Sequence, residues 1–149
     1  MRKAILLFVL MSLAVSAGCA ATSDNTGDLP EFIDSADLDL RNLNGKHILY
    51  FWQASCPPCV DKLPELNELV TQLPEDVKLL LVNNRDSQSR MERVLAGYEH
   101  LTVYRNGNDI FQAYQIRYTP TYVFLDADGA EYHQHVGPIE NSEILDLIS

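Results

Sequence analysis

Three features are scarce in this chain of 149 residues, and each scarcity argues against a class of protein or site. Basic residues are few: the chain has 11 Lys and Arg and 21 Asp and Glu, which gives a net charge of −10. An acidic surface repels phosphate backbones, which argues against nucleic-acid binding. The apolar run Ala4–Val15 has only 12 residues, too few to span a bilayer comfortably. No cysteine follows Cys59, so the second cysteine pair that usually completes a zinc site is missing.

The first 18 residues have the pattern of an export signal. Arg2 and Lys3 form a positive start, the apolar run follows, and the small residues 16–18 precede Cys19. This segment resembles the lipobox of bacterial lipoproteins, in which the cysteine becomes the lipidated N-terminus, although Ser16 stands where Leu is usual. The alternative is an ordinary cleaved signal with an incidental cysteine.

Cysteine parity favours lipidation of Cys19. An odd thiol is a liability in an exported protein, and a lipid on Cys19 leaves Cys56 and Cys59 as a self-contained pair. We therefore expect a lipoprotein-type signal peptide at 1–18, a polar flexible tether at 19–30 and one domain at 31–149. The protein would lie outside the cytoplasm in a bacterial cell envelope, facing the periplasm from the outer or the inner membrane.

The strongest chemical signal is the segment Cys56-Pro57-Pro58-Cys59. It follows an apolar run typical of a buried strand, and a helical pattern begins at Pro57, whose missing N–H suits a first helical turn. The positive helix end favours a thiolate at Cys56, and a thiol so placed can have a pKa well below about 8.5. The spacing predicts thiol–disulfide exchange, in which Cys56 attacks and Cys59 resolves the mixed disulfide.

Two other interpretations of the cysteine pair remain open. A structural disulfide over so short a loop would constrain the unfolded chain little. A copper or zinc site could combine Cys56 and Cys59 with His133 and His135, which lie two apart on a predicted strand and so face one side. More often such histidines form an exposed strand face. We expect no metal and no cofactor beyond a redox-active Cys56–Cys59 disulfide.

Hydrophobic periodicity predicts an α/β fold with a mixed sheet. Pro64 is expected to kink the first helix and Asp109 to cap the third, while Asp86, Glu92 and Glu99 are expected to be solvated helix charges. The predicted strands are 31–34, 47–54, 77–83, 101–104, 122–125 and 131–136, and the predicted helices are 57–73, 87–98, 110–115 and 139–148.

Several motifs together resemble the thioredoxin-like family. They are Phe51-Trp52 ahead of the cysteine pair, Pro64 five residues after Cys59, and Tyr118-Thr119-Pro120-Thr121 before a strand. The helix and strand expected between Asn83 and Gly107 resemble the insertion of exported, membrane-tethered members of the TlpA/ResA type.

The resemblance implies a thioredoxin-like fold, with a central mixed sheet flanked by helices and a small helix–strand insertion after the second βα unit. It implies that Cys56 attacks, that Cys59 resolves, and that Pro120 is a cis-proline facing the disulfide. Thr119 would offer its backbone to an extended substrate segment. The other expected neighbours of the site are Trp52, Pro57, Pro58 and Lys62.

Three positions depart from the family pattern. Tyr50 stands where thioredoxins have a buried Asp, and Lys62 stands where many TlpA/ResA-type proteins have a Glu. Lys62 could favour the thiolate electrostatically, but a solvated helix lysine is the expected position. Ser55 also replaces the Trp often found before the attacking cysteine.

The predicted function is that of a membrane-anchored, extracytoplasmic thiol–disulfide oxidoreductase, acting mainly as a reductant. Its partners would be disulfides and thiols of exported proteins, and its electrons would come from a membrane donor. The alternatives are a dithiol oxidase or isomerase, and a copper or zinc chaperone that uses Cys56, Cys59 and the two histidines.

Overall fold

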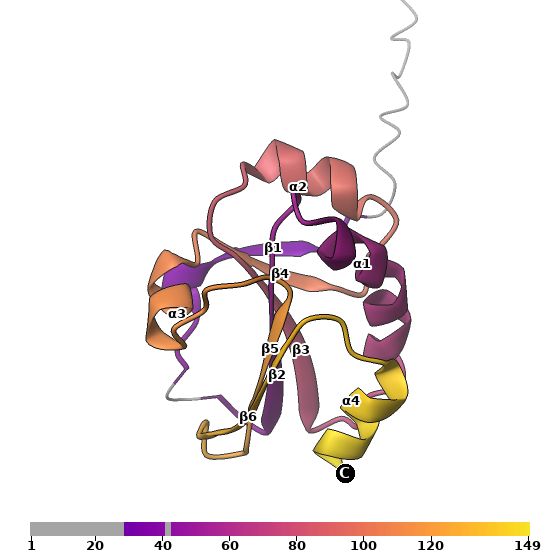
Figure 1. Ribbon diagram of the computed structural model, residues 1–149, viewed down its shortest axis with the longest axis vertical. Coiled ribbons are helices and arrows are strands. Elements are labelled where there is room, and N and C mark those ends of the chain that lie inside the picture. The colour runs from indigo at the N-terminus through magenta and orange to yellow at the C-terminus, as the bar shows by residue number, and fades with distance from the viewer. Residues whose placement is uncertain (1–28, 41–42) are drawn as a thin grey trace, which may run out of the picture.

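The computed structural model describes residues 29–40 and 43–149 (Figure 1). The predicted signal peptide, the lipidation site Cys19 and most of the predicted tether lie outside these residues. In the described part, no helix is both long and apolar enough to cross a bilayer.

One six-stranded sheet forms the centre of the domain, in the order β1-β4-β3-β2-β5-β6. Strands β1, β4, β3 and β2 run parallel to one another, whereas β5 pairs antiparallel with both β2 and β6. The predicted mixed sheet is confirmed. The strand bounds are β1 Glu31–Asp34, β2 Lys46–Trp52, β3 Val77–Asn83, β4 Thr102–Arg105, β5 Thr121–Leu125 and β6 Glu131–Val136.

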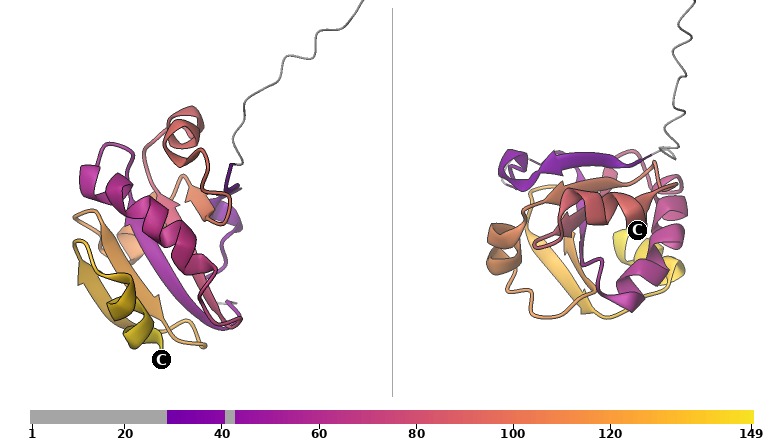
Figure 2. Two further views of the ribbon diagram at one scale, coloured as in Figure 1. Left: turned by 90° about the vertical axis from the view of Figure 1, so that its right-hand side faces the viewer. Right: turned by 90° about the horizontal axis from the view of Figure 1, so that it is seen from above.

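Helices cover both faces of the sheet. Helices α1, α2 and α4 contribute to the larger apolar core on one face, and α3 contributes to the smaller core on the other. Figure 2 shows α1 and α4 lying together across the sheet. The helix bounds are α1 Pro57–Val70, α2 Gln88–Leu95, α3 Asn108–Ala113 and α4 Asn141–Ile148, and a short 3-10 turn covers Ser35–Asp37.

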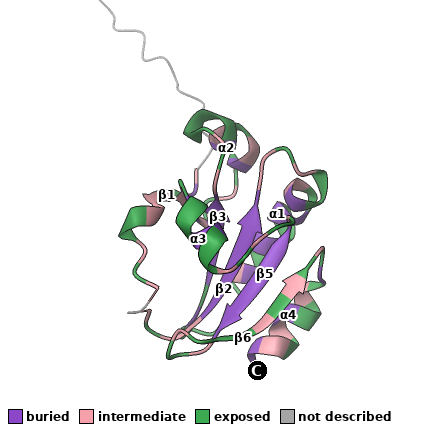
Figure 3. Ribbon diagram, turned by 60° about the vertical axis from the view of Figure 1, so that its left-hand side comes forward, coloured by how far each residue is buried: buried purple, intermediate pink, exposed green. Residues whose placement is uncertain are grey.

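Strand β2 explains why both faces need cover. Its alternate residues Tyr50 and Trp52 belong to the larger core, whereas Leu49 and Phe51 belong to the smaller one. Side chains alternate along a strand, so a run that is apolar at every position must be buried on both faces. Figure 3 shows β2 and β5 as buried strands in the middle of the molecule.

Helix α2 and strand β4 form the predicted insertion. Strand β4 lies between β1 and β3, pairing Val103 with Leu81 on one side and with Phe32 on the other. The inserted strand therefore separates the edge strand β1 from β3 and from β2, the strand that leads to the cysteine motif.

The helix ends differ from the predicted ones. Helix α1 contains Pro64 and ends at Val70, after which the chain continues as hydrogen-bonded turns rather than helix. The predicted cap at Asp109 is wrong, because Gly107 is the N-cap of α3. A Cβ atom on Gly107 would come within 2.5 Å of Cγ1 of Val82, so the close approach of this turn to β3 requires glycine.

Candidate active site

The two cysteines of the C-x-x-C motif lie where the chain passes from β2 into α1. Cys56 and Cys59 form a disulfide, with 5.2 Å between their Cα atoms. Cys56 has an extended backbone and is the N-cap of α1. It is partly exposed, whereas Cys59 in the first turn is fully buried. An incoming molecule can therefore reach Cys56 but not Cys59.

The two prolines between the cysteines remove backbone donors from the start of α1. Pro57 and Pro58 are both exposed, and neither has an N–H group. The N–H groups of Cys59 and Val60 remain, and both donate to the carbonyl oxygen of Cys56, at 3.0 and 3.1 Å. A thiolate at Cys56 would thus be stabilised more by the helix dipole than by a set of free N–H groups.

The loop before β5 approaches Cys56 from the other side. The Thr119–Pro120 peptide bond is cis, the isomer that the resemblance implies. The carbonyl oxygen of Thr119 lies 3.4 Å from Sγ of Cys56. A disulfide sulfur carries no proton, so this is a van der Waals contact, and only the reduced thiol could donate a hydrogen bond here. Tyr118, the residue before Thr119, is 71% exposed, so this loop presents an aromatic ring to solvent.

Tyr50 lies directly behind the buried cysteine. Its hydroxyl donates a 3.0 Å hydrogen bond to the carbonyl oxygen of Cys59, and its ring centroid lies 4.8 Å from that of Tyr122. Burial, reinforced by the neighbouring Tyr122, raises the pKa of Tyr50 far above its usual range. The phenol is therefore neutral at physiological pH. It holds the first turn of α1 in place and cannot replace a carboxylate as a proton acceptor.

The structure contradicts the solvated position expected for Lys62. The residue is only 6% exposed, and its ammonium group pairs with the carboxylate of Glu65. The reason is helical spacing, because Lys62 follows Cys59 by three residues and shares the buried face of α1 with Cys59 and Leu66. The aliphatic part of the lysine is covered, and its ammonium group reaches the surface of the protein, where Glu65 is exposed.

Asp86 is also not the solvated helix charge that was expected. Its side chain is 5% exposed, and it precedes α2 rather than lying in it. Its Oδ2 atom accepts hydrogen bonds from the backbone N–H of Ala54, at 2.7 Å, and from the amide of Asn83, at 2.8 Å. Arg90 lies 3.5 Å from its other oxygen. This carboxylate ties the loop before Cys56 to the end of β3.

Asp86 is the residue of the site that sequence reasoning missed. A signal was present, because Asn83 ends β3 and Asp86 follows it, and β3 neighbours the strand that leads to Cys56. Parallel neighbours end at the same edge of a sheet, so polar residues after β3 are expected near the loop after β2. The side chain of Asn83 also accepts the N–H groups of Arg85 and Asp86, which folds the turn so that Asp86 faces Ala54.

The remaining predicted residues fall into two groups. Trp52 is fully buried in the larger core beneath the site, and its indole N–H has no partner among the described residues. His133 and His135 lie on β6, with ring centroids 5.5 Å from Phe124 and 6.3 Å from Tyr122. Within residues 29–40 and 43–149, no group of three or more potential metal ligands forms a site.

Comparisons with known proteins agree on one family. A family model described as thioredoxin-like matches residues 45–131. The thiol-disulfide oxidoreductase ResA of Halalkalibacterium halodurans is 28% identical, and the match covers 79% of this chain and 71% of the relative. The sporulation thiol-disulfide oxidoreductase A of Bacillus subtilis is 27% identical over 95% of this chain and 94% of the relative.

Solved structures share the fold. StoA from Bacillus subtilis superimposes with a TM-score of 0.67 at 25% identity, over 79% of this chain and 92% of that one. The pneumococcal exposed lipoprotein thioredoxin Etrx1 from Streptococcus pneumoniae gives a TM-score of 0.65 at 25% identity, over 71% of this chain and 84% of that one.

Proposed function

This chain belongs to the thioredoxin-like family and is a thiol–disulfide oxidoreductase, and we propose that it reduces disulfides of exported proteins through Cys56 and Cys59. The observation that carries the proposal is the asymmetry of the pair, because Cys56 is partly exposed and Cys59 is fully buried. Only Cys56 can meet a protein substrate. Cys59 can attack only a bond that has already formed at Cys56.

The reaction transfers two electrons from the protein to the substrate. The Cys56 thiolate attacks one sulfur of the substrate disulfide, the substrate S–S bond breaks, and the leaving thiolate takes up a proton. The Cys59 thiol then loses its proton and attacks Sγ of Cys56, which releases the second substrate thiol and leaves the Cys56–Cys59 disulfide. The pair itself carries the electrons, so the reaction needs no other cofactor.

The loop at Thr119 and Pro120 is suited to hold the substrate chain. The Thr119 carbonyl is in contact with the reacting sulfur, and an extended peptide that pairs with this loop would bring its own cysteine beside Cys56. Trp52, Pro57 and Pro58 shape the surroundings, since Trp52 fills the core below and the two prolines form the exposed start of α1.

We place the protein on the extracytoplasmic side of a bacterial membrane, anchored by lipid on Cys19 after removal of residues 1–18. The support is the signal-like sequence with its lipobox-like end and the likeness to an exposed lipoprotein thioredoxin. A membrane donor would then return two electrons and two protons to the disulfide, since this compartment is oxidising. Labelling with a radioactive fatty acid tests the anchor, because Cys19→Ser should abolish both the label and the recovery of protein in the membrane fraction.

Reduction of insulin disulfides tests the activity. Cys56→Ser should abolish turnover while the circular dichroism spectrum and the melting temperature stay close to those of the wild-type protein. Undiminished reduction by this variant would contradict the proposed role of Cys56.

The direction of electron flow is tested by the reduction potential of the pair. A value near or below about −250 mV, towards the thioredoxin end of the scale, supports a reductant. A value near about −120 mV makes the protein a dithiol oxidase, and its substrates would then be reduced, newly exported chains.

A further inference from the structure

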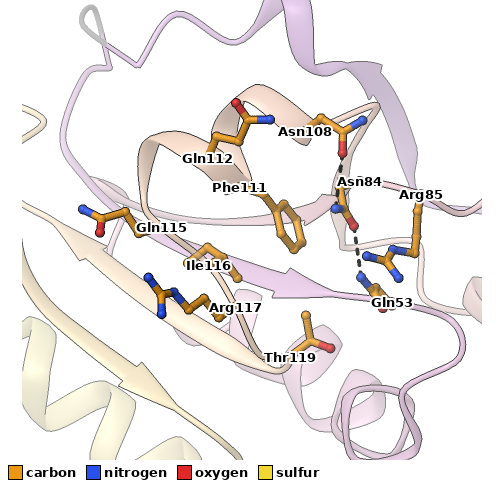
Figure 4. Close-up of a pocket in the computed structure, with 10 residues that line it drawn as sticks. All are labelled: Gln53, Asn84, Arg85, Asn108, Phe111, Gln112, Gln115, Ile116, Arg117 and Thr119. Carbon is orange, nitrogen blue, oxygen red and sulfur yellow. Dashed lines mark hydrogen bonds between the residues drawn. The ribbon is translucent and has the colours of Figure 1, made fainter.

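A cavity of about 530 Å³ opens beside the loop that contacts the reacting sulfur (Figure 4). Gln53 lines it from the end of β2, Asn84 and Arg85 from the end of β3, and the loop before β5 closes it. The cavity thus lies at the carboxyl ends of two parallel strands, the edge of an open α/β sheet at which ligands bind most often.

Two residues that line the cavity also contact Cys56. Thr119 lines the cavity, and its carbonyl oxygen lies 3.4 Å from Sγ of Cys56. Gln53 also lines it, and the carbonyl oxygen of Gln53 accepts the backbone N–H of Cys56 at 3.0 Å. A substrate chain joined to Cys56 and extended along Thr119 would therefore pass close to this cavity. Residues in an extended chain are about 3.3 Å apart, so a residue one to three positions from the substrate cysteine comes within reach.

The charge of the cavity is opposite to that of the protein. Its lining contains Arg85 and Arg117 and no Asp or Glu, although the chain has 21 acidic and 11 basic residues. Both arginines are exposed, and neither forms an ion pair with a residue of the described part. Arg90 and Arg105, by contrast, each lie beside a carboxylate. The two cavity arginines are thus free to bind an external anion.

The rest of the lining is neutral and polar over an apolar base. The amide of Asn84 accepts a hydrogen bond from Gln53, at 3.1 Å, and donates one to Asn108, at 3.3 Å. These three side chains form an ordered amide wall in Figure 4, next to the buried ring of Phe111. An apolar base with amides and guanidinium groups around it suits a side chain that has a short hydrocarbon part and a terminal carboxylate.

We propose that this cavity is a specificity subsite that binds the carboxylate of an Asp or Glu one to three residues from the reacting cysteine of the substrate polypeptide. The subsite rests on the proposed function of the Cys56–Cys59 pair. Guanidinium groups bind carboxylates with charge-assisted hydrogen bonds, which Arg85 and Arg117 supply. The acidic remainder of the surface repels acidic partners, so the attraction is confined to the place where it helps to orient the target disulfide.

The test uses three disulfide-containing peptides that are identical except for Glu, Gln or Lys two residues from the target cysteine. The full chain should reduce the Glu peptide with a kcat/KM about 3- to 10-fold above that of the Lys peptide, with the Gln peptide between them. The preference should shrink as salt is added, because the arginines are exposed.

Substitution of the arginines assigns the preference to the cavity. The Arg85→Gln/Arg117→Gln double variant should reduce the Glu and Lys peptides at rates within twofold of each other, and the reduction potential of its Cys56–Cys59 pair should stay that of the wild-type chain. Arg93→Gln is the matched control, since Arg93 is an exposed arginine at the end of α2 with the same charge. It should retain the full preference.

The outcomes separate this subsite from the proposed function. Equal reduction of all three peptides by the wild-type chain, or a preference that survives the double substitution, overturns the subsite and leaves the oxidoreductase role intact. Absence of reduction of every peptide overturns the proposed function. In that case the subsite is tested by the binding of the same peptides with Ala in place of both cysteines. The wild-type chain must bind the Glu peptide more tightly than the Lys peptide, and the double variant must bind the two equally.

Discussion

The buried carboxylate of Asp86 makes a sharp prediction about stability. Its Oδ2 atom accepts hydrogen bonds from the N–H of Ala54 and from the amide of Asn83, a side chain that is itself almost fully buried. Asp86→Ala leaves both donors without a partner. An unsatisfied buried donor costs about 1–3 kcal/mol, and Ala54 is only partly covered, so the free energy of unfolding should fall by about 2–4 kcal/mol.

Two further variants show which part of the interaction matters. Asp86→Asn can present its amide oxygen to the same two donors, so it should lose only the charge and cost about 1 kcal/mol. Arg90→Ala removes a guanidinium that is 49% exposed and 3.5 Å from the carboxylate, and such a pair contributes at most about 1 kcal/mol.

Urea denaturation measures all three free energies, and hydrogen exchange of the Ala54 amide gives a local measurement. Exchange at Ala54 should accelerate strongly in Asp86→Ala, slightly in Asp86→Asn and not in Arg90→Ala. If Asp86→Ala costs no more than Arg90→Ala, Asp86 does not tie the loop before Cys56 to β3, and the reasoning is refuted.

Three further predictions concern the surroundings of β2. Burial lowers the pKa of His47, so as the pH falls the unfolded chain binds a proton at this residue at a higher pH than the folded chain does. The free energy of unfolding should therefore decrease between about pH 7 and pH 5.5, the range around the ordinary His pKa of about 6.5. Urea midpoints of His47→Gln should show a smaller decrease over the same range. Tyr50→Phe removes the hydrogen bond to the Cys59 carbonyl and should cost about 1 kcal/mol in the same assay, whereas an unchanged midpoint would show that the bond is unimportant. Gly45→Ala should lower the melting temperature by several degrees. Gly45 has a φ of +86°, and a Cβ atom there would lie 2.2 Å from the carbonyl oxygen of Asp76. An unchanged melting temperature would mean that the turn rearranges freely.

The sequence predicts the main features of the fold because they depend on local patterns. The apolar run of β2, followed by Cys56, Pro57 and a helical stripe, determines a buried strand that leads into a helix. The bounds of β3 and β6 are the predicted ones, since turn residues mark both ends of each strand. The order of these patterns also predicts the mixed sheet, and the family resemblance adds the insertion and the cis peptide bond at Pro120.

What the sequence does not predict is the burial of charge. Asp86 and Lys62 were expected in solvent, because charged residues are mostly exposed. Asp86 is buried where the backbone N–H of Ala54, 32 residues earlier, donates to it, a contact that no local pattern shows. The spacing of Lys62 from Cys59 indicates burial, since the two residues share one face of α1. Its positive charge nevertheless argues for exposure, because the sequence does not show that Glu65 pairs with it.

The cavity next to Thr119 could not be predicted for a similar reason. Arg85 and Arg117 are 32 positions apart, and each alone is an ordinary exposed arginine. The sheet order brings the ends of β2 and β3 and the loop before β5 to one edge, and only there do the two charges become a site.

The central claim is that Cys56 is the sulfur that meets the substrate, and trapping of the mixed disulfide tests it most directly. Each of Cys59→Ser and Cys56→Ser is incubated with the same disulfide peptide, and the adducts are measured by intact mass. The account predicts a stable adduct on Cys56 in the Cys59→Ser variant and none in the Cys56→Ser variant, because Cys59 is fully buried. Equal adduct formation by both variants would contradict it.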